Sequence, residues 1–468
     1  MTGGRADVAI IGMSCTFPKA PDLDSFWDNI VGGVDAISDP PPGWGPDDIF
    51  APECPDNDRI YCRRGGFLNG LTHFDPVRFG VMPSSIDGGE PDHFLALRLA
   101  EEALEDAGYA ARPFPRERTA VILGRGEYFN RGNVTALQHG MIVDQIIDIV
   151  RQVSPEHSAD ALAKLKAALK ASLPPFRAET APGLVPNVVA GRIANRLDLM
   201  GPNYTVDAAC ASSLIAVDHG VRELVSGRCD MAIVGGVHAS TPPIIYMVFC
   251  QLNALSRSGC IRPFDSKADG TILGEGLGFL VLKRRADAER DDDRIYAIIR
   301  GIGIASDGRA LGVLAPRLEG EVLAMRRAYE AAGVDPETIE LIEAHGTGTP
   351  VGDATEAEAL RRVFSKRSGV RNRVAVGSIK SMIGHTMPAA GAAGLIKCSL
   401  ALYHKVLPLS LHCDEPSPSL FEDTCLYVNT ETLPWIHGRE TPRRAAVSAF
   451  GFGGINAHVV LEEARHGA

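Results

Sequence analysis

The sequence has 468 residues, of which 45% are hydrophobic and 22% charged, a balance that fits a folded globular chain and excludes a largely disordered one. Its 47 Lys and Arg stand against 58 Asp and Glu, and the net charge of −11 argues against a broad basic surface for nucleic acid or anionic lipid. Ten cysteines without a CxxC pair or zinc spacing, and no apolar leader or unbroken apolar span, predict a cytoplasmic protein with no metal site and no contact with a membrane.

The first half of the chain alternates short apolar runs with amphipathic stretches. We predict a strand at 8–12, a helix at 92–108, strands at 119–123 and 204–206, a helix at 212–226 and a strand at 231–234. Residues 128–182 depart from this pattern, because they are polar and helical, with a distinct helix at 160–170. We interpret them as an insertion that caps the core.

After a charged break at 285–293 the alternation begins again. We predict strands at 295–299, 339–343 and 374–377, helices at 319–332, 354–364 and 389–404, and a hairpin of 446–450 with 457–461. The second half therefore repeats the first in the order and type of its elements. We expect one duplicated α/β fold, with halves 1–284 and 285–468, rather than three independent domains.

Four segments carry residues that suit chemistry. The first places Cys210 between a strand and a helix, where backbone N–H groups and the helix dipole favour a thiolate and predict a lowered pKa. A developing oxyanion would find donors at the same place. A small buried structural cysteine at a tight turn is the alternative, although the alanines around Cys210 leave room for a substrate.

The second segment delivers His345 from an apolar strand into a loop of glycine and threonine. The hydroxyls of Thr347 and Thr349 could meet a polar ligand. A phosphate cradle is a competing interpretation, but no GxxxxGK[ST] motif is present. His345 could also serve only as a turn residue.

The third segment is another corner between a strand and a helix, and it carries Lys380 and His385. In the duplicated unit it corresponds to the Cys210 corner, so we expect the two corners to face each other. Taken alone, His385 could be a helix cap and Lys380 a solvated loop charge. The fourth segment is a glycine-rich hairpin turn that could present Phe450, Phe452 and a backbone N–H to a pocket, or could be only a turn.

These segments, in this order, resemble the β-ketoacyl synthase (ketosynthase) family of the thiolase fold, as found in type I polyketide synthases. The resemblance runs from residues 8–18 through 262–270 and 274–276 to 456–458. It implies a thiolase-like α/β fold whose duplicated halves form a five-layer α-β-α-β-α sandwich. It also implies an acyltransferase that performs a decarboxylative Claisen condensation of malonyl-carrier protein with a bound acyl group.

The resemblance also implies a role for each candidate residue. Cys210 would accept the acyl group, His345 and His385 would be the catalytic histidines, and Lys380 would support them. Thr347, Thr349, Phe450 and Phe452 would meet the substrate and its phosphopantetheine arm, and the N–H of Phe452 would join that of Cys210 in an oxyanion hole. No cofactor would be bound by the domain itself, because the substrates travel on the phosphopantetheine of an acyl carrier protein.

Some positions depart from the common pattern and narrow the resemblance. Ala208 and Ala211 stand where Thr and Ser are usual, residues 89–93 replace a Met-Asp-Pro-Gln segment, and Ile455 replaces Thr. With the insertion, these variants resemble the ketosynthases of iterative enediyne polyketide synthases, and next those of polyunsaturated fatty acid synthases. Because the fold begins almost at the first residue and ends where such synthases continue, we expect the first domain of a larger iterative enzyme. The resemblance implies a homodimer. Since carrier proteins of this class are usually acidic, as this chain is, we expect a carrier tethered in cis and docked by a local basic patch.

Two other kinds of protein are rivals. A thiolase or starter-type synthase shares the fold but needs another cysteine or an asparagine in place of one histidine, and both His345 and His385 are present. A non-catalytic partner subunit that sets chain length would lack the nucleophile, and Cys210 is present.

Overall fold

A computed structural model of the chain describes residues 7–54, 56–87, 89–126, 130–309, 312–364, 374–417, 421, 424–438 and 441–464. Its centre is an eleven-stranded sheet in the order β10-β8-β7-β12-β13-β6-β1-β5-β4-β2-β3. The two halves of the sheet meet where β1 (Val8–Thr16) pairs with β6 (Ala297–Ser306) over three residues only. The strands of the first half are β1, β5 (Gly276–Arg284), β4 (Met231–His238), β2 (Thr119–Gly124) and β3 (Asn203–Val206). Those of the second are β6, β13 (Ile455–Glu462), β12 (Arg444–Gly451), β7 (Leu341–Glu343), β8 (Val374–Gly377) and β10 (Leu426–Val428).

Pairing follows the same pattern in both halves, counted outward from the junction. In the first half two antiparallel pairs, β1 with β5 and β5 with β4, precede two parallel pairs, β4 with β2 and β2 with β3. In the second half β6 with β13 and β13 with β12 are antiparallel, and the pairs from β12 outward are parallel. The predicted duplication of one α/β unit is confirmed.

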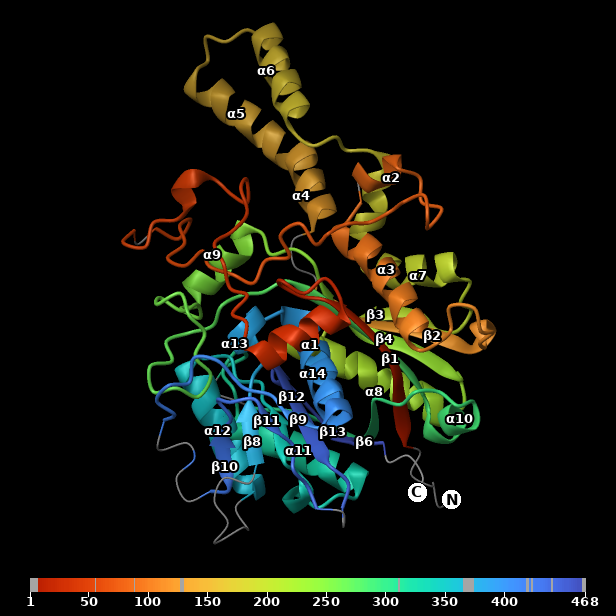
Figure 1. Ribbon diagram of the computed structural model, residues 1–468. Helices are drawn as coiled ribbons and strands as arrows, with labels where there is room; N and C mark the ends of the chain where they lie inside the picture. Colours follow the sequence, from red (N-terminus) through yellow and green to blue (C-terminus); the bar gives the residue numbers. More distant parts are fainter. Residues whose placement is uncertain are drawn as a thin grey trace.

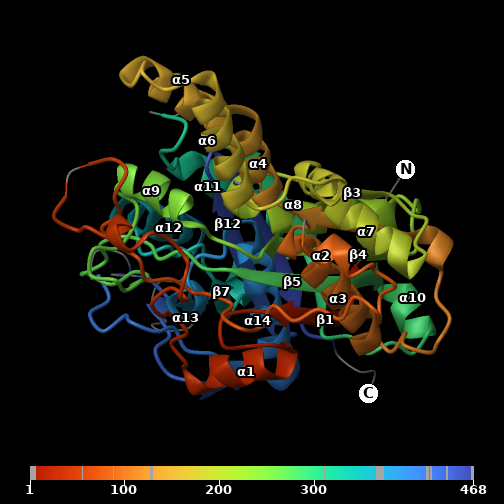
Figure 2. The same cartoon turned by 90° about the horizontal axis from the view of Figure 1, so that it is seen from above.

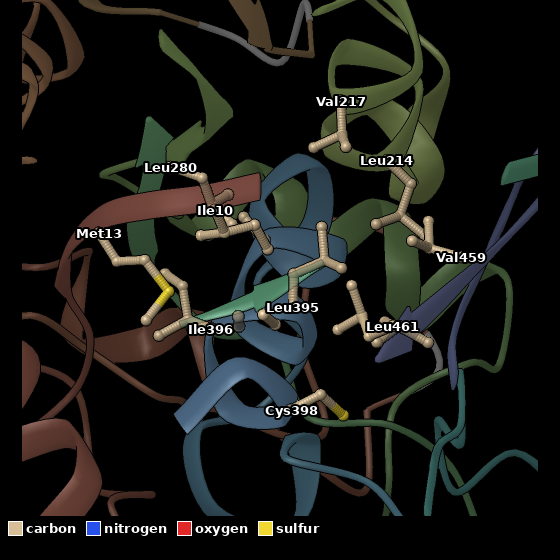
Figure 3. Packing of buried hydrophobic residues seen from close by; sticks show 14 of the residues in the cluster. Ile10, Met13, Leu214, Val217, Leu280, Leu395, Ile396, Cys398, Val459 and Leu461 are labelled. Atoms are coloured by element: carbon tan, nitrogen blue, oxygen red, sulfur yellow. The ribbon is translucent and has the colours of Figure 1, made fainter. Parts of the chain in front are cut away.

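Helices form three layers around the two halves of the sheet. α8 (Ser212–Val225) and α14 (Ala390–His404) lie between the halves, α3 (Pro91–Asp106) and α7 (Val188–Leu197) cover the outer side of the first, and α11 (Leu318–Ala332) and α12 (Pro350–Phe364) cover the second (Figure 1). Figure 3 shows Leu214 of α8 and Leu395 of α14 packed among strand residues such as Ile10 and Val459. Burial of this central apolar layer holds the five layers of the predicted sandwich together.

Several elements differ from the predictions. β1 continues to Thr16, whereas we predicted that it ends at Gly12. Gly12 does not mark a turn. It lets α3 pack closely on the strand, since a Cβ there would lie 2.5 Å from the carbonyl oxygen of Ala103. α9 (Pro243–Gln251) and β5 were not predicted, since both are apolar on every side and show no period. The charged break contains the short helix α10 (Arg285–Arg290). The remaining short elements are α1 (Leu23–Gly32), α2 (Ser84–Asp87), α13 (Lys380–Ile383), and the paired strands β9 (Val406–Leu407) and β11 (Leu433–Pro434).

The insertion forms a helical arm that stands away from the body (Figures 1 and 2). It consists of α4 (Arg131–Leu137), α5 (Val143–Val153) and α6 (Ala159–Ser172), with a π-helical turn at Gln138–Ile142; residues 128 and 129 lie outside the described residues. The base of the arm is attached to the body, since the Glu90 carboxylate accepts a hydrogen bond from the Gly132 N–H at 2.8 Å. α5 and α6 project beyond this base, and the capping role of the insertion stays a prediction. Among the described residues no helix combines the length and apolarity needed to cross a membrane.

Candidate active site

One cavity of about 370 Å³ collects almost all of the candidate residues. Its wall includes Cys210 after β3, His345 after β7, His385 after β8 and both Phe450 and Phe452 at the end of β12. Thr347 and Thr349 line it as well. The carboxyl ends of strands from both halves therefore converge on one site, and the expectation that the Cys210 and His385 corners face each other is confirmed.

Cys210 lies on a strained turn. It follows Ala209, whose φ of +48° is rare for a residue with a side chain, and it precedes the first turn of α8. The side chain is buried, and burial raises the pKa of the thiol to about 11. The charge of Lys380 and the backbone N–H groups of Phe452 and Cys210 oppose this rise but do not cancel it. The prediction of a lowered pKa is therefore wrong, because the loss of solvation outweighs the helix N-terminus.

The same two N–H groups form a candidate oxyanion hole. The backbone N–H groups of Phe452 and Cys210 both lower the pKa of the Cys210 thiol, so both lie near enough to favour its thiolate, although they come from opposite halves of the chain. Gly451 allows this approach, because a Cβ there would lie 2.5 Å from the carbonyl oxygen of Ala208. The hairpin and the nucleophile turn thus pack backbone against backbone, and two donors point to the place where an acyl oxygen would gain charge.

Glu356 fixes the backbone around His345. Its two carboxylate oxygens accept the N–H groups of His345 and Gly346, each at 2.8 Å. The Phe450 N–H donates to Nδ1 of His345 at 3.4 Å, which leaves the proton of the neutral ring on Nε2. The ring centroids of His345 and His385 lie 5.5 Å apart with the planes at 86°.

His385 is held by its backbone in the middle of the molecule. The N–H of His385 donates to the carbonyl oxygen of Ile272 at 2.7 Å, and the carbonyl oxygen of His385 accepts the N–H of Gly274 at 2.9 Å. Burial, and then the charge of Lys380, lowers the pKa of both His345 and His385 well below the usual value. Both imidazoles are therefore neutral and each can offer an N–H to a substrate oxygen. His385 is not a helix cap, because the residues at the N-caps of the two neighbouring helices are Ile379 and Thr386.

Lys380 is buried at the first turn of α13 and is not a solvated loop charge. Behind it lies a buried ion pair in which Lys397 Nζ donates to Glu343 at 2.6 Å, and the other oxygen of Glu343 accepts the Ile379 N–H at 2.7 Å. Burial lowers the pKa of Lys380, and the charges of Glu343 and Glu356 oppose that shift. The pair thus positions the turn that carries Lys380.

The backbone N–H groups of the glycine-threonine loop donate to carboxyl groups of the chain and are not available to a phosphate. Asp353 accepts the Gly348 N–H at 3.1 Å, and Glu356 takes the N–H groups at the start of the loop. Burial raises the pKa of both carboxyls to about 7. Because these N–H donors already have carboxyl partners within the chain, the phosphate-cradle interpretation is wrong. The hydroxyls of Thr347 and Thr349 lie 2.9 Å apart at the cavity wall.

Two phenylalanines take different positions. Phe450 is buried beside the His345 ring, with centroids 5.5 Å apart. Phe452 is half exposed at the mouth and stacks on Phe249 of α9 at 6.0 Å. In the described part of the chain no group of three or more His, Cys, Asp or Glu side chains is arranged to hold a metal ion.

Sequence reasoning missed the supporting residues Glu343, Asp353, Glu356, Lys397 and Phe249. Glu343 and Lys397 were detectable as charges inside otherwise apolar elements, which signal a buried partner. Phe249 carried no such signal, because it belongs to a helix without an apolar period.

Comparisons with known proteins match nearly the whole chain. Residues 5–288 match the family described as "Beta-ketoacyl synthase, N-terminal domain", residues 296–414 its C-terminal domain and residues 416–468 the "Ketoacyl-synthetase C-terminal extension". A polyunsaturated fatty acid synthase of Thraustochytrium sp. is 41% identical over 98% of this chain, and polyketide synthase PksL of Bacillus subtilis is 38% identical over 97%. The chain spans only 16% and 9% of these two relatives.

A solved structure agrees with both fold and sequence. The ketosynthase from module 6 of the bacillaene synthase of Bacillus subtilis has a TM-score of 0.83 and 37% identity, and the match covers 98% of this chain and 72% of that one. The thiolase-like fold and the family matches together give the identification: the chain belongs to the β-ketoacyl synthase family, the condensing acyltransferases that serve as ketosynthase domains in type I polyketide synthases.

Proposed function

We propose that this domain elongates an acyl chain held on Cys210 with malonyl units, and that Cys210, His345 and His385 perform the chemistry. The observation that carries the proposal is the single cavity in which the sulfur faces two N–H donors and two neutral histidines. Lys380 is proposed as the supporting charge. The nucleophile then belongs to the half 1–284 and both histidines to the half 285–468.

The first step is acyl transfer. The sulfur of Cys210 attacks the carbonyl carbon of an acyl thioester, its proton passes to the departing carrier thiol, and the N–H groups of Phe452 and Cys210 hold the oxyanion. Because the pKa of the thiol is about 11, the anionic sulfur is a minor species in the resting enzyme. The nearby charge of Lys380 favours that species.

The second step is decarboxylation followed by carbon–carbon bond formation. Loss of CO₂ from a malonyl thioester leaves an electron pair on the α-carbon and negative charge on the thioester oxygen. The Nε2–H of His345 and the imidazole of His385 donate to that oxygen. The carbanion then attacks the acyl carbon, the bond to Cys210 breaks, and the thiolate is released with a 3-oxoacyl thioester as product.

We propose that both substrates arrive on the phosphopantetheine of an acyl carrier protein, in cis, with Thr347 and Thr349 along the arm and Phe450 and Phe452 beside the reacting groups. We also propose a cytoplasmic homodimer, a proposal supported by the half-buried strand β3, which ends the sheet without a further neighbour among the described residues. The cysteines are all free thiols, as a reducing compartment requires.

The iterative assignment is the finer part of the proposal. The 41% identity to a polyunsaturated fatty acid synthase supports repeated elongation of a polyene chain, in a fatty acid synthase or in an enediyne-type polyketide synthase. A non-catalytic partner that sets chain length is the second candidate. It would not need the two donors that face the Cys210 sulfur.

The test uses the purified domain with acyl and malonyl groups on a carrier protein. Mass spectrometry should find the acyl group on the peptide of Cys210 and a 3-oxoacyl carrier as product. The Cys210→Ala variant should form neither. If Cys210→Ala still condensed the two carriers, the nucleophile assignment would be wrong; if the unaltered domain trapped no acyl group, the partner-subunit function would be favoured.

A further inference from the structure

Four carboxyl groups belong to the described wall of the catalytic cavity, those of Asp307, Glu321, Asp353 and Glu356, and all four are buried. Asp307 accepts the side-chain amide of Asn456 at 2.7 Å, and Asp353 and Glu356 accept backbone N–H groups. Glu321 is only 1% exposed, and its Oε2 has no hydrogen-bond partner in the described part of the chain. A buried polar atom without a partner costs free energy, so Glu321 is the group to which a ligand would supply a missing hydrogen bond.

The first turn of α11 carries two acidic residues, Glu319 and Glu321, whose surroundings differ. Glu319 is 60% exposed and pairs with Arg317 at 3.0 Å. Gly320 between them lets the turn pack on the loop that carries Asp307, because a Cβ at Gly320 would collide with a carboxylate oxygen of Asp307. One carboxyl of the turn is therefore held in the cavity wall while its neighbour stays in solvent.

Glu321 is a neutral carboxylic acid. Burial raises the pKa of its carboxyl well above the usual value, and the charges of Glu356 and Asp307 raise it further. None of the described residues that line the cavity is Lys or Arg, so no cation in that wall favours the ionised form. A neutral carboxyl has one O–H that donates a hydrogen bond. Glu321 can therefore donate to an acceptor oxygen inside the cavity.

Glu321 also lies beside the segment that carries His345. The charge of Glu356 acts on the Glu321 carboxyl, so the two groups are close together. Glu356 in turn accepts the backbone N–H groups of His345 and Gly346, each at 2.8 Å. In the proposed mechanism His345 binds the thioester oxygen of the malonyl group. An acid at this place is therefore near the other end of the same small group, its carboxylate.

We propose that Glu321 recognises the malonyl unit by donating its carboxyl O–H to the malonyl carboxylate. This inference rests on the proposed function. Of the groups that enter the cavity in that reaction, the carboxylate is the strongest acceptor, because it carries a full negative charge. With neither Lys nor Arg in the described wall, neutral donors have to bind it.

A neutral donor suits a carboxylate that must leave as CO₂. A fixed positive charge would stabilise the carboxylate before the reaction more than the uncharged CO₂ that forms, and would so raise the barrier. In the proposed step the bond between the α-carbon and the carboxylate breaks, and its electron pair stays on the α-carbon. CO₂ departs uncharged, and the proton of Glu321 remains on Glu321.

The test measures the two half-reactions of the purified domain separately. Acylation of Cys210 by an acyl carrier uses the phosphopantetheine arm but brings no carboxylate, whereas condensation with a malonyl carrier brings both. Glu321→Met removes the O–H, and Glu321→Gln keeps a neutral donor in its place. The matched control is Glu319→Met, which changes an exposed acid in the same turn.

In Glu321→Met, kcat/KM for the malonyl carrier should fall about ten- to a hundredfold, the scale of one lost hydrogen bond to a charged group. Acylation of Cys210 should be unchanged in that variant, which also shows that its site is folded. Glu321→Gln should recover most of the loss, and Glu319→Met should match the unaltered domain in both half-reactions.

Equal losses of acylation and condensation in Glu321→Met would place Glu321 against the phosphopantetheine arm, which both half-reactions share, and would overturn the proposal. A loss in Glu321→Gln as large as that in Glu321→Met would show that hydrogen-bond donation is not the role of this residue, and would overturn it too. Unchanged condensation in Glu321→Met would do the same. If the unaltered domain neither acylated Cys210 nor formed a 3-oxoacyl carrier, the proposed function itself would have failed, and this inference with it.

Discussion

The imidazole of His345 accepts the backbone N–H of Phe450 at Nδ1, over 3.4 Å. Because an amide N–H only donates, this bond assigns the single proton of the neutral ring to Nε2. The hairpin that carries Phe452, a candidate oxyanion donor, thus also sets the tautomer of a histidine in the wall of the same cavity. In the proposed mechanism, one element prepares both the acyl group and the enolate for reaction.

His345→Ala should lower the rate of condensation by roughly 10²- to 10⁴-fold, since an enolate loses one of its donors. His345→Gln, whose amide N–H can take the place of Nε2–H, should recover part of that loss. Acylation of Cys210, followed by mass spectrometry, should change little in either variant. Equal loss of acylation in both would show that His345 only maintains the shape of the site.

The pH profile should show no histidine step. Burial and Lys380 keep the pKa of His345 and His385 well below the usual value near 6.5, so neither gains a proton between pH 8 and 6. With saturating acyl and malonyl carriers, no fall of kcat near pH 6.5 should come from the histidines. Asp353 and Glu356 have pKa values of about 7, so the profile is also measured in Asp353→Asn and Glu356→Gln. A twofold or greater fall centred near 6.5 that persisted in both variants would contradict the assignment of neutral donors.

Alkylation should reveal the electrostatic role of Lys380. The thiol of Cys210 has a pKa of about 11, which the Lys380 charge lowers against the effect of burial. The rate of modification by iodoacetamide should rise about tenfold per pH unit below that value, because only the thiolate reacts. Lys380→Met should slow the reaction at every such pH, and Lys380→Arg should restore it. Equal rates in all three proteins would show that Lys380 does not act on the sulfur.

Replacing one partner of the Glu343–Lys397 pair should lower the free energy of unfolding far more than replacing both. Both side chains are almost fully buried, so Glu343→Gln leaves an unpaired ammonium and should lower the free energy of unfolding by about 3–5 kcal/mol. Adding Lys397→Met removes that charge and should restore most of the loss in urea unfolding. Glu358→Gln is the control, since its pair with Arg361 is exposed and should contribute less than about 1 kcal/mol. A double variant no more stable than Glu343→Gln would contradict this account.

Acid should destabilise the fold through His458. Its ring is buried between the hydroxyls of Ser448 and Tyr329, each at 3.0 Å, and burial lowers its pKa to about 3. The unfolded chain takes up a proton near pH 6.5 and the native state does not, so the free energy of unfolding falls as the pH drops from 6.5 toward 3. At pH 4 the loss from this group reaches about 3 kcal/mol.

His458→Gln, compared with the exposed His157→Gln, should show a smaller difference in unfolding free energy between pH 7 and pH 4. Identical pH dependence in both variants would show that His458 is not the group that titrates. Circular dichroism in a urea series at each pH measures the difference.

The sequence by itself determined the duplicated order of strands and helices, because each unit repeats the same buried apolar periods. It also located Cys210, His345, Lys380, His385 and the hairpin of Phe452, because each sits where a strand ends in small residues. Such signals can be read from the sequence because they depend on residues close together in the chain.

Only the tertiary structure decided what depends on packing between segments far apart in the chain. β5 shows no alternation because it is covered on both faces, and α9 shows no apolar period because apolar side chains occupy its exposed face as well as its buried one. Glu356 becomes a partner of His345, and Glu343 a partner of Lys380, only when the fold brings their elements together. The pKa of Cys210 was the sharpest difference. A strand-to-helix corner lowers the pKa of the thiol through nearby N–H groups. Removal of solvent from the sulfur by the whole fold raises that pKa by more.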